Sequence, residues 1–458
     1  MVEMFRGGVR LTRLRWKRRG GSCKRPPRGE DGRYTNSFWV SFLFATICLI
    51  LATSLHAQDA VTTLAGQPLV SGAANGTGTN ALFSDPAAMV ADTNGNMFVA
   101  DSRNDAIRKI TTNGVVTTFA GQLGVPGTAN ATGTNAQFNT PSGLAFDAGG
   151  NLLVSDTGNN TLRKITPAGA VSLFAGVAGA GGFADGATGS ALFTSPLGIA
   201  VAANGSVFVA DSGNHCVREI SGGTVTTFAG SPQIWGSVDA TGTNAQFDGP
   251  IGLAFDTDGN LFVSDANNDT LREITTNGVV TTYAGQAGVD GSTDGSLRSA
   301  RFRSPAEMVF DPKGNLFVAD SFNQTVREIT PDGVVSTVSG VPGISGTNDG
   351  VNGLGKFFNP YGLAVAVDGS LLVADTYNET VRMVLVPFKL SAPAAGAAGG
   401  RTLSWDTVIG KTYQAQFKDV LTAVWTNLGP PVQATGLTVT VTDPSAAASR
   451  YYRVLRVE

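Results

Sequence analysis

Short apolar runs alternate with Gly-, Asn- and Asp-rich turns through most of the chain. One representative stretch contains the runs GLAFD (252–256), LFVSD (261–265), TLREI (270–274) and VVTTYAG (279–285), separated by TDGN, ANND and TNG. Runs of this length, rich in β-branched and aromatic residues and bounded by turn residues, predict β-strands. Four in succession predict an antiparallel meander with two apolar faces, so each such sheet must pack between neighbours.

The meander repeats with a period of 54 or 55 residues. The period is set by a Gly that ends each fourth run, at Gly66, Gly121, Gly176, Gly230, Gly285 and Gly340. Six copies fill 61–387, which predicts a repeat architecture. Six four-stranded sheets stacked radially form an all-β, six-bladed β-propeller. The array starts with a fourth-type run (61–66) and ends with a third-type run (381–387), so we expect these two to pair and close the ring.

Three polar residues recur in every unit: an Asp that ends the second run, an Asn three positions later and an Arg seven positions after the Asp. The Asp residues are Asp101, Asp156, Asp211, Asp265, Asp320 and Asp375. The Asn residues are Asn104, Asn159, Asn214, Asn268, Asn323 and Asn378, and the Arg residues are Arg108, Arg163, Arg218, Arg272, Arg327 and Arg382. Asp and Asn side chains bond nearby backbone groups in tight turns. We expect the Arg to bond the Asp or turn carbonyls and to fix the packing of the blades, because an active site is rarely copied six times.

The stretch 250–278, P-x-G-L-A-x-D-x-x-G-N-L-x-V-S-D-x-x-N-x-x-L-R-x-I-x-x-x-G, resembles the NHL repeat. The resemblance covers about 61–387 and implies a six-bladed NHL propeller. The family's Asn falls on the six repeated Asn residues, whereas its namesake His falls only on His215. The other units carry Asn, Asp, Gln or Glu at that position, so a structural turn role for His215 is favoured over a ligand-binding one.

The net charge differs in sign between the N-terminal segment and the rest of the chain. Residues 1–57 contain 11 Lys/Arg and 3 Asp/Glu, a net +8, while 58–458 contain 21 and 32, a net −11. The apolar run 38–55 behind the basic part predicts a signal peptide cleaved after about Ala57, hence export; a retained single-pass anchor is the alternative. A membrane contact is expected only through that segment. Cleavage leaves one cysteine, Cys216, so no intramolecular disulfide is expected. The acidic mature chain argues against nucleic-acid binding.

Binding is expected on the face where the long connections between units emerge. In a meander these connections, about 20 residues long as in 286–305, lie at the same end as the turn between the second and third strands. Loops on a rigid scaffold are where binding residues gather. Departures from the repeat give the candidate ligand-binding residues Trp235, Glu307, Tyr361, Phe322, Tyr377 and His215. Glu307 replaces a Gly at the start of the innermost strand and is expected near the channel mouth.

The sequence favours a monomeric, non-catalytic binding protein for a protein or carbohydrate ligand, without cofactor or metal. DTNGN (92–96) and DTDGN (256–260) resemble calcium loops only faintly and are explained as turns. Lyases with NHL propellers use histidine-bound metal, which this chain cannot supply. Six-bladed lactonases bind calcium through carboxylates and Asn, so a calcium-dependent hydrolase with carboxylates at the channel mouth remains the alternative. A structural spacer is a third possibility.

The C-terminal part is predicted to form a separate module. The predicted domains are the leader 1–57, the propeller 58–388, a small-residue linker 389–399 and a module over 400–458. Its strand-like runs weakly resemble a reduced fibronectin type III-like β-sandwich. Trp405, Tyr413, Trp425 and Tyr452 are expected to fill its core.

Overall fold

A computed structural model describes residues 60–351, 353–386, 394–395, 401–407, 411–419, 424–444 and 450–457. The described residues all belong to one compact unit, Leu55–Glu458. The predicted leader 1–57 with its apolar run 38–55 lies outside them, as does the predicted linker apart from 394–395. Within the described ranges, the chain forms no helix with the length and apolarity that a membrane crossing requires.

Residues 60–385 form six antiparallel sheets, which follow the predicted meander. We number them sheet 1 to sheet 6 in the chain order of their first strands. The first strands are β3 (Pro86–Ala91), β7 (Pro141–Phe146), β12 (Pro196–Val201), β17 (Pro250–Phe255), β22 (Pro305–Phe310) and β27 (Pro360–Val365). The second strands are β4 (Met97–Asp101), β8 (Leu152–Asp156), β13 (Val207–Asp211), β18 (Leu261–Asp265), β23 (Leu316–Asp320) and β28 (Leu371–Asp375). The third strands are β5 (Ala106–Ile110), β9 (Thr161–Ile165), β14 (Cys216–Ser221), β19 (Thr270–Ile274), β24 (Thr325–Ile329) and β29 (Thr380–Leu385).

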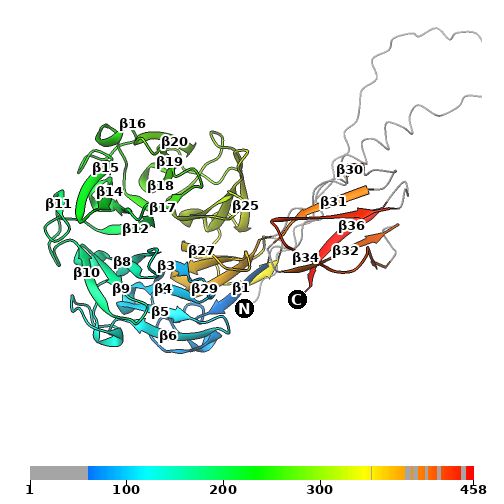
Figure 1. Ribbon diagram of the computed structural model, residues 1–458, viewed down its shortest axis with the longest axis horizontal. Helices are drawn as coiled ribbons and strands as arrows, with labels where there is room; N and C mark the ends of the chain where they lie inside the picture. The colour runs from blue at the N-terminus through cyan, green and yellow to red at the C-terminus, as the bar shows by residue number, and fades with distance from the viewer. Residues whose placement is uncertain are drawn as a thin grey trace, which may run out of the picture. The chain divides into compact units, whose positions relative to one another are not determined.

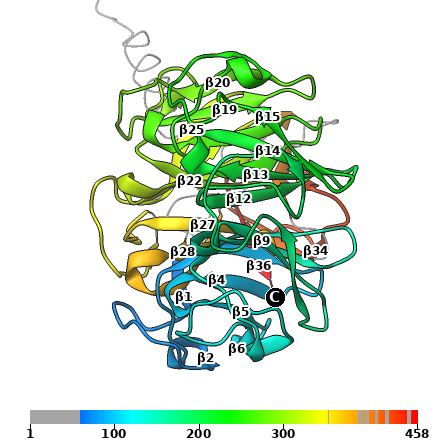
Figure 2. The ribbon, with the colours of Figure 1, turned by 90° about the vertical axis from the view of Figure 1, so that its left-hand side faces the viewer.

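The fourth strands complete the sheets. In sheets 1 to 5 they are β6 (Val115–Ala120), β10 (Val171–Ala175), β15 (Thr224–Ala229), β20 (Val279–Gly285) and β25 (Val334–Gly340). In sheet 6 the fourth strand is β1 (Ala60–Ala65) from the other end of the array, which pairs antiparallel with β29 and places Thr62 opposite Met383. Figure 2 shows the strands of sheet 3 following one another outward from β12 to β15.

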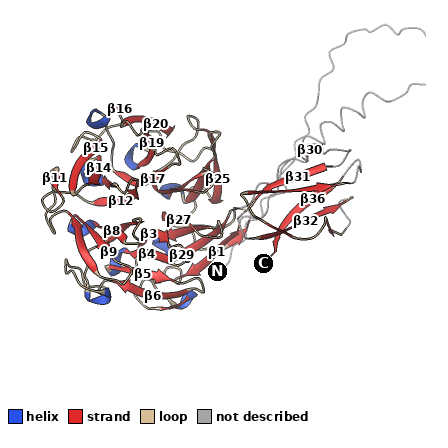
Figure 3. Cartoon of the chain, viewed as in Figure 1, coloured by secondary structure: helices blue, strands red, loops and turns tan. Residues whose placement is uncertain are grey.

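A fifth, two-residue strand borders five of the sheets, which the sequence did not predict. These strands are β2 (Gly76–Thr77), β11 (Gly186–Ala187), β16 (Ala240–Thr241), β21 (Gly295–Ser296) and β26 (Gly350–Val351). Each pairs with the fourth strand of its sheet and comes from the long connection that enters that sheet. One-turn 3-10 helices mark the turns between the second and third strands, among them Ser212–Asn214 and Ser321–Asn323 (Figure 3).

The first strands lie innermost and contact one another in succession, with β27 also contacting β3 (Figure 1). One apolar core fills the space between each pair of successive sheets, and a further core of the same kind lies between sheet 6 and sheet 1. There, Leu372 and Val381 of sheet 6 pack with Met97 and Ile110 of sheet 1. This stacking explains why every residue of the second strands is buried, because neighbouring sheets cover both of their faces.

The C-terminal residues form two small sheets. One contains β30 (Ala394–Ala395), β31 (Arg401–Asp406) and β35 (Thr438–Asp443). The other contains β32 (Thr412–Lys418), β33 (Thr426–Asn427), β34 (Val432–Gln433) and β36 (Tyr451–Val457). Trp405, Tyr413 and Tyr452 are buried in their core. Trp425 is not, which corrects the prediction: it is half-buried, with the Lys418 ammonium 4.6 Å from its ring centroid. Strand β30 falls inside the predicted linker.

Candidate functional site

The long connections lie at the end of the sheets where the second and third strands turn. Each connection starts with a tight turn whose left-handed residue donates its backbone N–H to the carbonyl of the repeated Asn. Gly124 bonds Asn104 at 2.9 Å, and Gln233 bonds Asn214 at 2.8 Å. We call this end of the sheets the long-loop face. Its position agrees with the sequence-based expectation.

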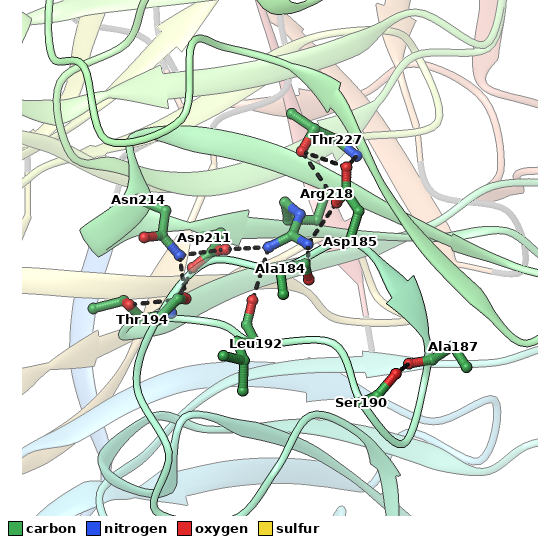
Figure 4. A network of polar contacts seen from close by, with 11 residues as sticks. Ala184, Asp185, Ala187, Ser190, Leu192, Thr194, Asp211, Asn214, Arg218 and Thr227 are labelled. Carbon is green, nitrogen blue, oxygen red and sulfur yellow. Dashed lines mark hydrogen bonds and ion pairs between the residues drawn. The ribbon is translucent and has the colours of Figure 1, made fainter.

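The repeated Arg anchors the connection that enters its own sheet (Figure 4). Arg218 is fully buried and donates from Nη1 to Asp211 at 2.7 Å and to the carbonyl of Leu192 at 3.0 Å. Its Nη2 donates to the carbonyl of Ala184 at 2.8 Å and to the carboxylate of Asp185 at 2.7 Å. Arg108, Arg163, Arg272, Arg327 and Arg382 make the same bonds to their Asp and loop carbonyls.

The Asp at the centre of each network accepts further hydrogen bonds. Asp211 accepts the backbone N–H of Thr194 at 2.8 Å and the Asn214 amide at 2.9 Å. Burial raises the pKa of this carboxyl, and the bonds from Asn214, Thr194 and Arg218 oppose that rise. In four repeats the pKa is raised by burial to about 6, namely in Asp101, Asp265, Asp320 and Asp375. The Asp and Arg side chains are buried in all six repeats, so they hold the loops and are not accessible to a ligand.

The repeated Phe before the Pro packs under the same guanidinium. Phe193 is fully buried, with the Arg218 guanidinium 5.1 Å from its ring centroid. The corresponding separations in the other repeats are 5.1 to 5.7 Å. The Phe therefore anchors the loop in the sheet.

His215 occupies the left-handed position that closes the second-to-third strand turn, with φ of 56°. Its Nδ1 accepts the backbone N–H of Gly249, at the entry to sheet 4, at 3.1 Å. Its counterparts accept the equivalent N–H at the entry to the next sheet. Asp105, Asn160, Asp269, Gln324 and Glu379 bond Thr140, Ser195, Ser304, Asn359 and Asp85 respectively. His215 therefore makes a structural hydrogen bond of the same kind as the residue at its position in every other repeat.

Cys216, next to His215, is fully buried at the start of β14. Burial raises the pKa of its thiol above the ordinary value, and the nearby Asp211 charge adds to that shift. A thiol held protonated in a closed core is a poor nucleophile.

Glu307 and Tyr361 lie on the neighbouring innermost strands β22 and β27. A Cβ on Gly252, at the Glu307 position of sheet 4, would overlap the carbonyl oxygen of Ala306, so the innermost strands are closely packed there. Both side chains are half-buried. Burial raises the pKa of Glu307 to about 8, and the N–H of Met308 opposes the rise. Burial, followed by the charge of Glu307, raises the pKa of Tyr361.

Exposed apolar side chains stand at the long-loop ends of the same two sheets. Phe322 is 51% and Tyr377 46% exposed, at equivalent positions of their turns in sheets 5 and 6. The ring of Tyr377 makes an edge-on contact with Phe358 at 5.1 Å between centroids. Ser321, beside Phe322, donates to the carbonyl of Pro360 at 2.6 Å and so ties the two sheets together. We call these exposed side chains of sheets 5 and 6 the apolar patch; its members are Phe322, Ile344, Phe358, Tyr377 and Leu69.

Three members of the patch were missed from the sequence. Ile344 follows Gly343, which bonds the carbonyl of Asn323, and Leu69 itself bonds the carbonyl of Asn378. Both are exposed. Phe358 could have been found, because it stands where the other repeats have Ser84, Asn139, Thr194, Asp248 and Arg303.

Four of the six candidate residues therefore share two adjacent sheets, while the other two do not. Trp235 is 70% exposed on the connection between sheets 3 and 4, and His215 lies in the turn of sheet 3. Among the residues the structure describes, no group of three or more His, Cys, Asp or Glu could hold a metal ion. The loops that resemble calcium sites are closed turns. Asp92, for example, accepts the backbone N–H groups of Asn94 and Asn96 at 2.9 and 2.8 Å.

Comparison with known proteins supports the NHL repeat family. The NHL repeat family model matches residues 138–165 and 193–220. The chain is 27% identical over 317 residues to Protein SUPPRESSOR OF QUENCHING 1, chloroplastic, of Arabidopsis thaliana, which covers 65% of this chain and 30% of that protein. It is 28% identical over 329 residues to NHL repeat-containing protein 2 of Bos taurus, covering 63% of this chain and 44% of that protein. The chain thus spans less than half the length of these two relatives.

The solved structures agree with a β-propeller. An auxiliary nutrient binding protein from Bacteroides thetaiotaomicron VPI-5482 superposes with a TM-score of 0.55 at 14% identity, covering 72% of this chain and 76% of that chain. At this identity the likeness concerns the fold alone. The repeated sheets define an all-β protein consistent with a β-propeller, and the NHL family model matches two of its repeats.

Proposed function

We propose that this protein is a closed, six-bladed NHL propeller that acts as an exported, non-catalytic binding scaffold. Its ligand is a protein or a glycan, held on the long-loop face over sheets 5 and 6. The observation that supports this most is the apolar patch at the long-loop ends of sheets 5 and 6, the two sheets that carry Glu307 and Tyr361. Exposed aromatic side chains on a rigid frame are typical binding anchors, and the six buried Arg networks provide that frame.

Closure supports the rigidity of this face. The hydroxyl of Thr376 in sheet 6 donates to the carbonyl of Pro86 in sheet 1 at 2.8 Å, as Ser321 does to Pro360 between sheets 5 and 6. Glu379 accepts the N–H of Asp85 at 2.7 Å, as His215 does from Gly249. The contacts between the last and first sheets are thus those found between successive sheets.

The proposal is tested by thermal unfolding of the full chain against a panel of glycans and peptides. A ligand at 100 times its dissociation constant should stabilise the protein by about 2.7 kcal/mol. We expect one class of ligand to raise the unfolding temperature, and Phe322→Ser with Tyr377→Ser to abolish the rise. Trp235→Ser changes a still more exposed aromatic residue on the connection between sheets 3 and 4; it is the control and should retain the rise.

Other outcomes would redirect the assignment. A rise that survives the patch variants and is lost in Trp235→Ser would move the site to the connection between sheets 3 and 4. A rise with calcium alone would favour the calcium-dependent hydrolase. No rise with any member of the panel would favour a structural spacer and count against this proposal.

A further inference from the structure

A groove of about 650 Å³ lies between sheets 1 and 2. It is bordered by the β3–β4 and β7–β8 turns, at the end of the sheets opposite the long-loop face. Its volume falls within the range of small-molecule sites. The apolar wall is formed by Phe98, Phe119 and Phe146. Phe98 meets the other two rings edge-on, with centroids 4.9 and 5.4 Å apart.

Lys109 provides the positive charge at this groove. Its side chain lines the groove and is half-buried, with Nζ 5.5 Å from the centroid of Phe98. No carboxylate in the described part of the chain lies within ion-pair distance of it. The carboxylates of Asp92 and Asp147, also at the groove, accept N–H groups of their own turns. Lys109 therefore makes no ion pair among the described residues, while Asp92 and Asp147 keep their negative charge but are held in their turns by N–H donors.

Other sheet interfaces repeat the aromatic wall with the opposite charge. Between sheets 3 and 4, Phe208 contacts Phe228 and Phe255 edge-on. Between sheets 4 and 5, Phe262 contacts Tyr283 and Phe310 edge-on. The residue paired with the central Phe is Lys109 in sheet 1, but Glu219 in sheet 3 and Glu273 in sheet 4. The lysine is therefore not required by the packing of the rings.

We propose that the groove between sheets 1 and 2 binds a small organic anion with a flat apolar body, such as an aromatic carboxylate. The body lies against the Phe98, Phe119 and Phe146 wall, and the anionic group pairs with Lys109. This site is independent of the long-loop face and of the function proposed for it.

The test uses 2-naphthoate as the probe and 2-naphthamide as its neutral counterpart, measured by calorimetric titration of the full-length protein. We expect naphthoate to bind at least tenfold more tightly than the amide. Lys109→Met should weaken naphthoate at least tenfold, and Lys109→Arg should retain affinity within about threefold, a ratio well below the tenfold step of 1.4 kcal/mol.

Lys164→Met is the matched control. Lys164 is the equivalent residue of sheet 2, but it pairs with Leu153, where the aromatic wall is absent. The Lys164→Met variant should bind naphthoate with the affinity of the wild type. Equal affinity for acid and amide, unchanged affinity in Lys109→Met, or no binding of naphthoate at millimolar concentration would each overturn the proposal. Circular dichroism of every variant confirms that a lost signal is not a lost fold.

Discussion

The guanidinium of Arg218 lies 2.7 Å from the carboxylate of Asp211, and both side chains are fully buried. In the β13–β14 pair, Arg218 stands opposite Val209. Val209 precedes Asp211 by two residues, so the side chains of Arg218 and Asp211 lie on the same face of sheet 3. The same arrangement in all six repeats fixes each long connection to its sheet.

Arg218→Met should lower the free energy of unfolding by about 3–5 kcal/mol, because it leaves the Asp211 carboxylate buried without its cation. Chemical denaturation measures this loss. Asp211→Asn combined with Arg218→Met should be less damaging than the single Arg218→Met change, since the uncompensated charge is removed. A loss below 1 kcal/mol in Arg218→Met would mean that the network does not hold the loop.

His215→Asn should leave stability within about 0.5 kcal/mol of the wild type, because Asn160 performs the same task in sheet 2 and Asn tolerates the left-handed backbone. His215→Ala should cost about 1–2 kcal/mol, since the N–H of Gly249 loses its acceptor. Denaturation curves of His215→Asn and His215→Ala measure these two changes in stability. If binding of a ligand were lost in His215→Asn while stability was kept, His215 would belong to a site.

Stability should depend on pH through Glu307, whose pKa is raised from 4.5 to about 8. The folded state holds this proton more tightly than the unfolded chain does. The stabilising contribution is therefore complete below pH 4.5 and is lost as the pH rises through 8. Glu307→Gln cannot ionise, so its unfolding temperature should equal that of the wild type near pH 4.5 and exceed it at pH 9.

The control for this pH dependence is Glu219→Gln, which changes a carboxylate on a third strand, away from the innermost strands. Its unfolding temperature relative to the wild type should not follow the same curve. A difference between Glu307→Gln and the wild type that stays constant from pH 4.5 to 9 would place Glu307 in open solvent.

Cys216 should resist thiol reagents in the folded protein. Its thiol is fully buried with a raised pKa, and each pKa unit lowers the thiolate fraction tenfold. We expect alkylation of the Cys216 peptide, followed by mass spectrometry, to be at least about 100-fold slower in the folded protein than in denaturant. Rapid alkylation without denaturant would show that β14 opens.

Much of the architecture follows from local signals. The 55-residue period, the four runs and the Asp–Arg spacing of seven could be interpreted because they report on neighbouring strands of one sheet. The bond between His215 and Gly249 could not, since it joins two sheets through residues 34 apart. The sequence does not reveal this acceptor either, because the His215 position is occupied by a different type of side chain in most repeats.

The candidate sites show a similar division. Glu307, Tyr361, Phe322 and Tyr377 stood out because each breaks the repeat. The groove between sheets 1 and 2 is lined by residues that conform to the repeat, namely Phe98, Phe119 and Phe146. It could therefore not be predicted from the sequence. The Phe358 contact with Tyr377 likewise depends on the fold that brings residues 358 and 377 together.

The account depends most on closure, because Phe358, Tyr361 and Tyr377 stand on the sheet that β1 completes. Thr62→Cys with Met383→Cys tests it, since these residues are directly opposite and such pairs lie within reach of a disulfide. Glu219→Cys with Thr226→Cys, the same position within the β14–β15 hairpin, is the control. Mild oxidation and peptide mapping should show both links within one chain. A link between 219 and 226 without one between 62 and 383 would contradict the closed propeller.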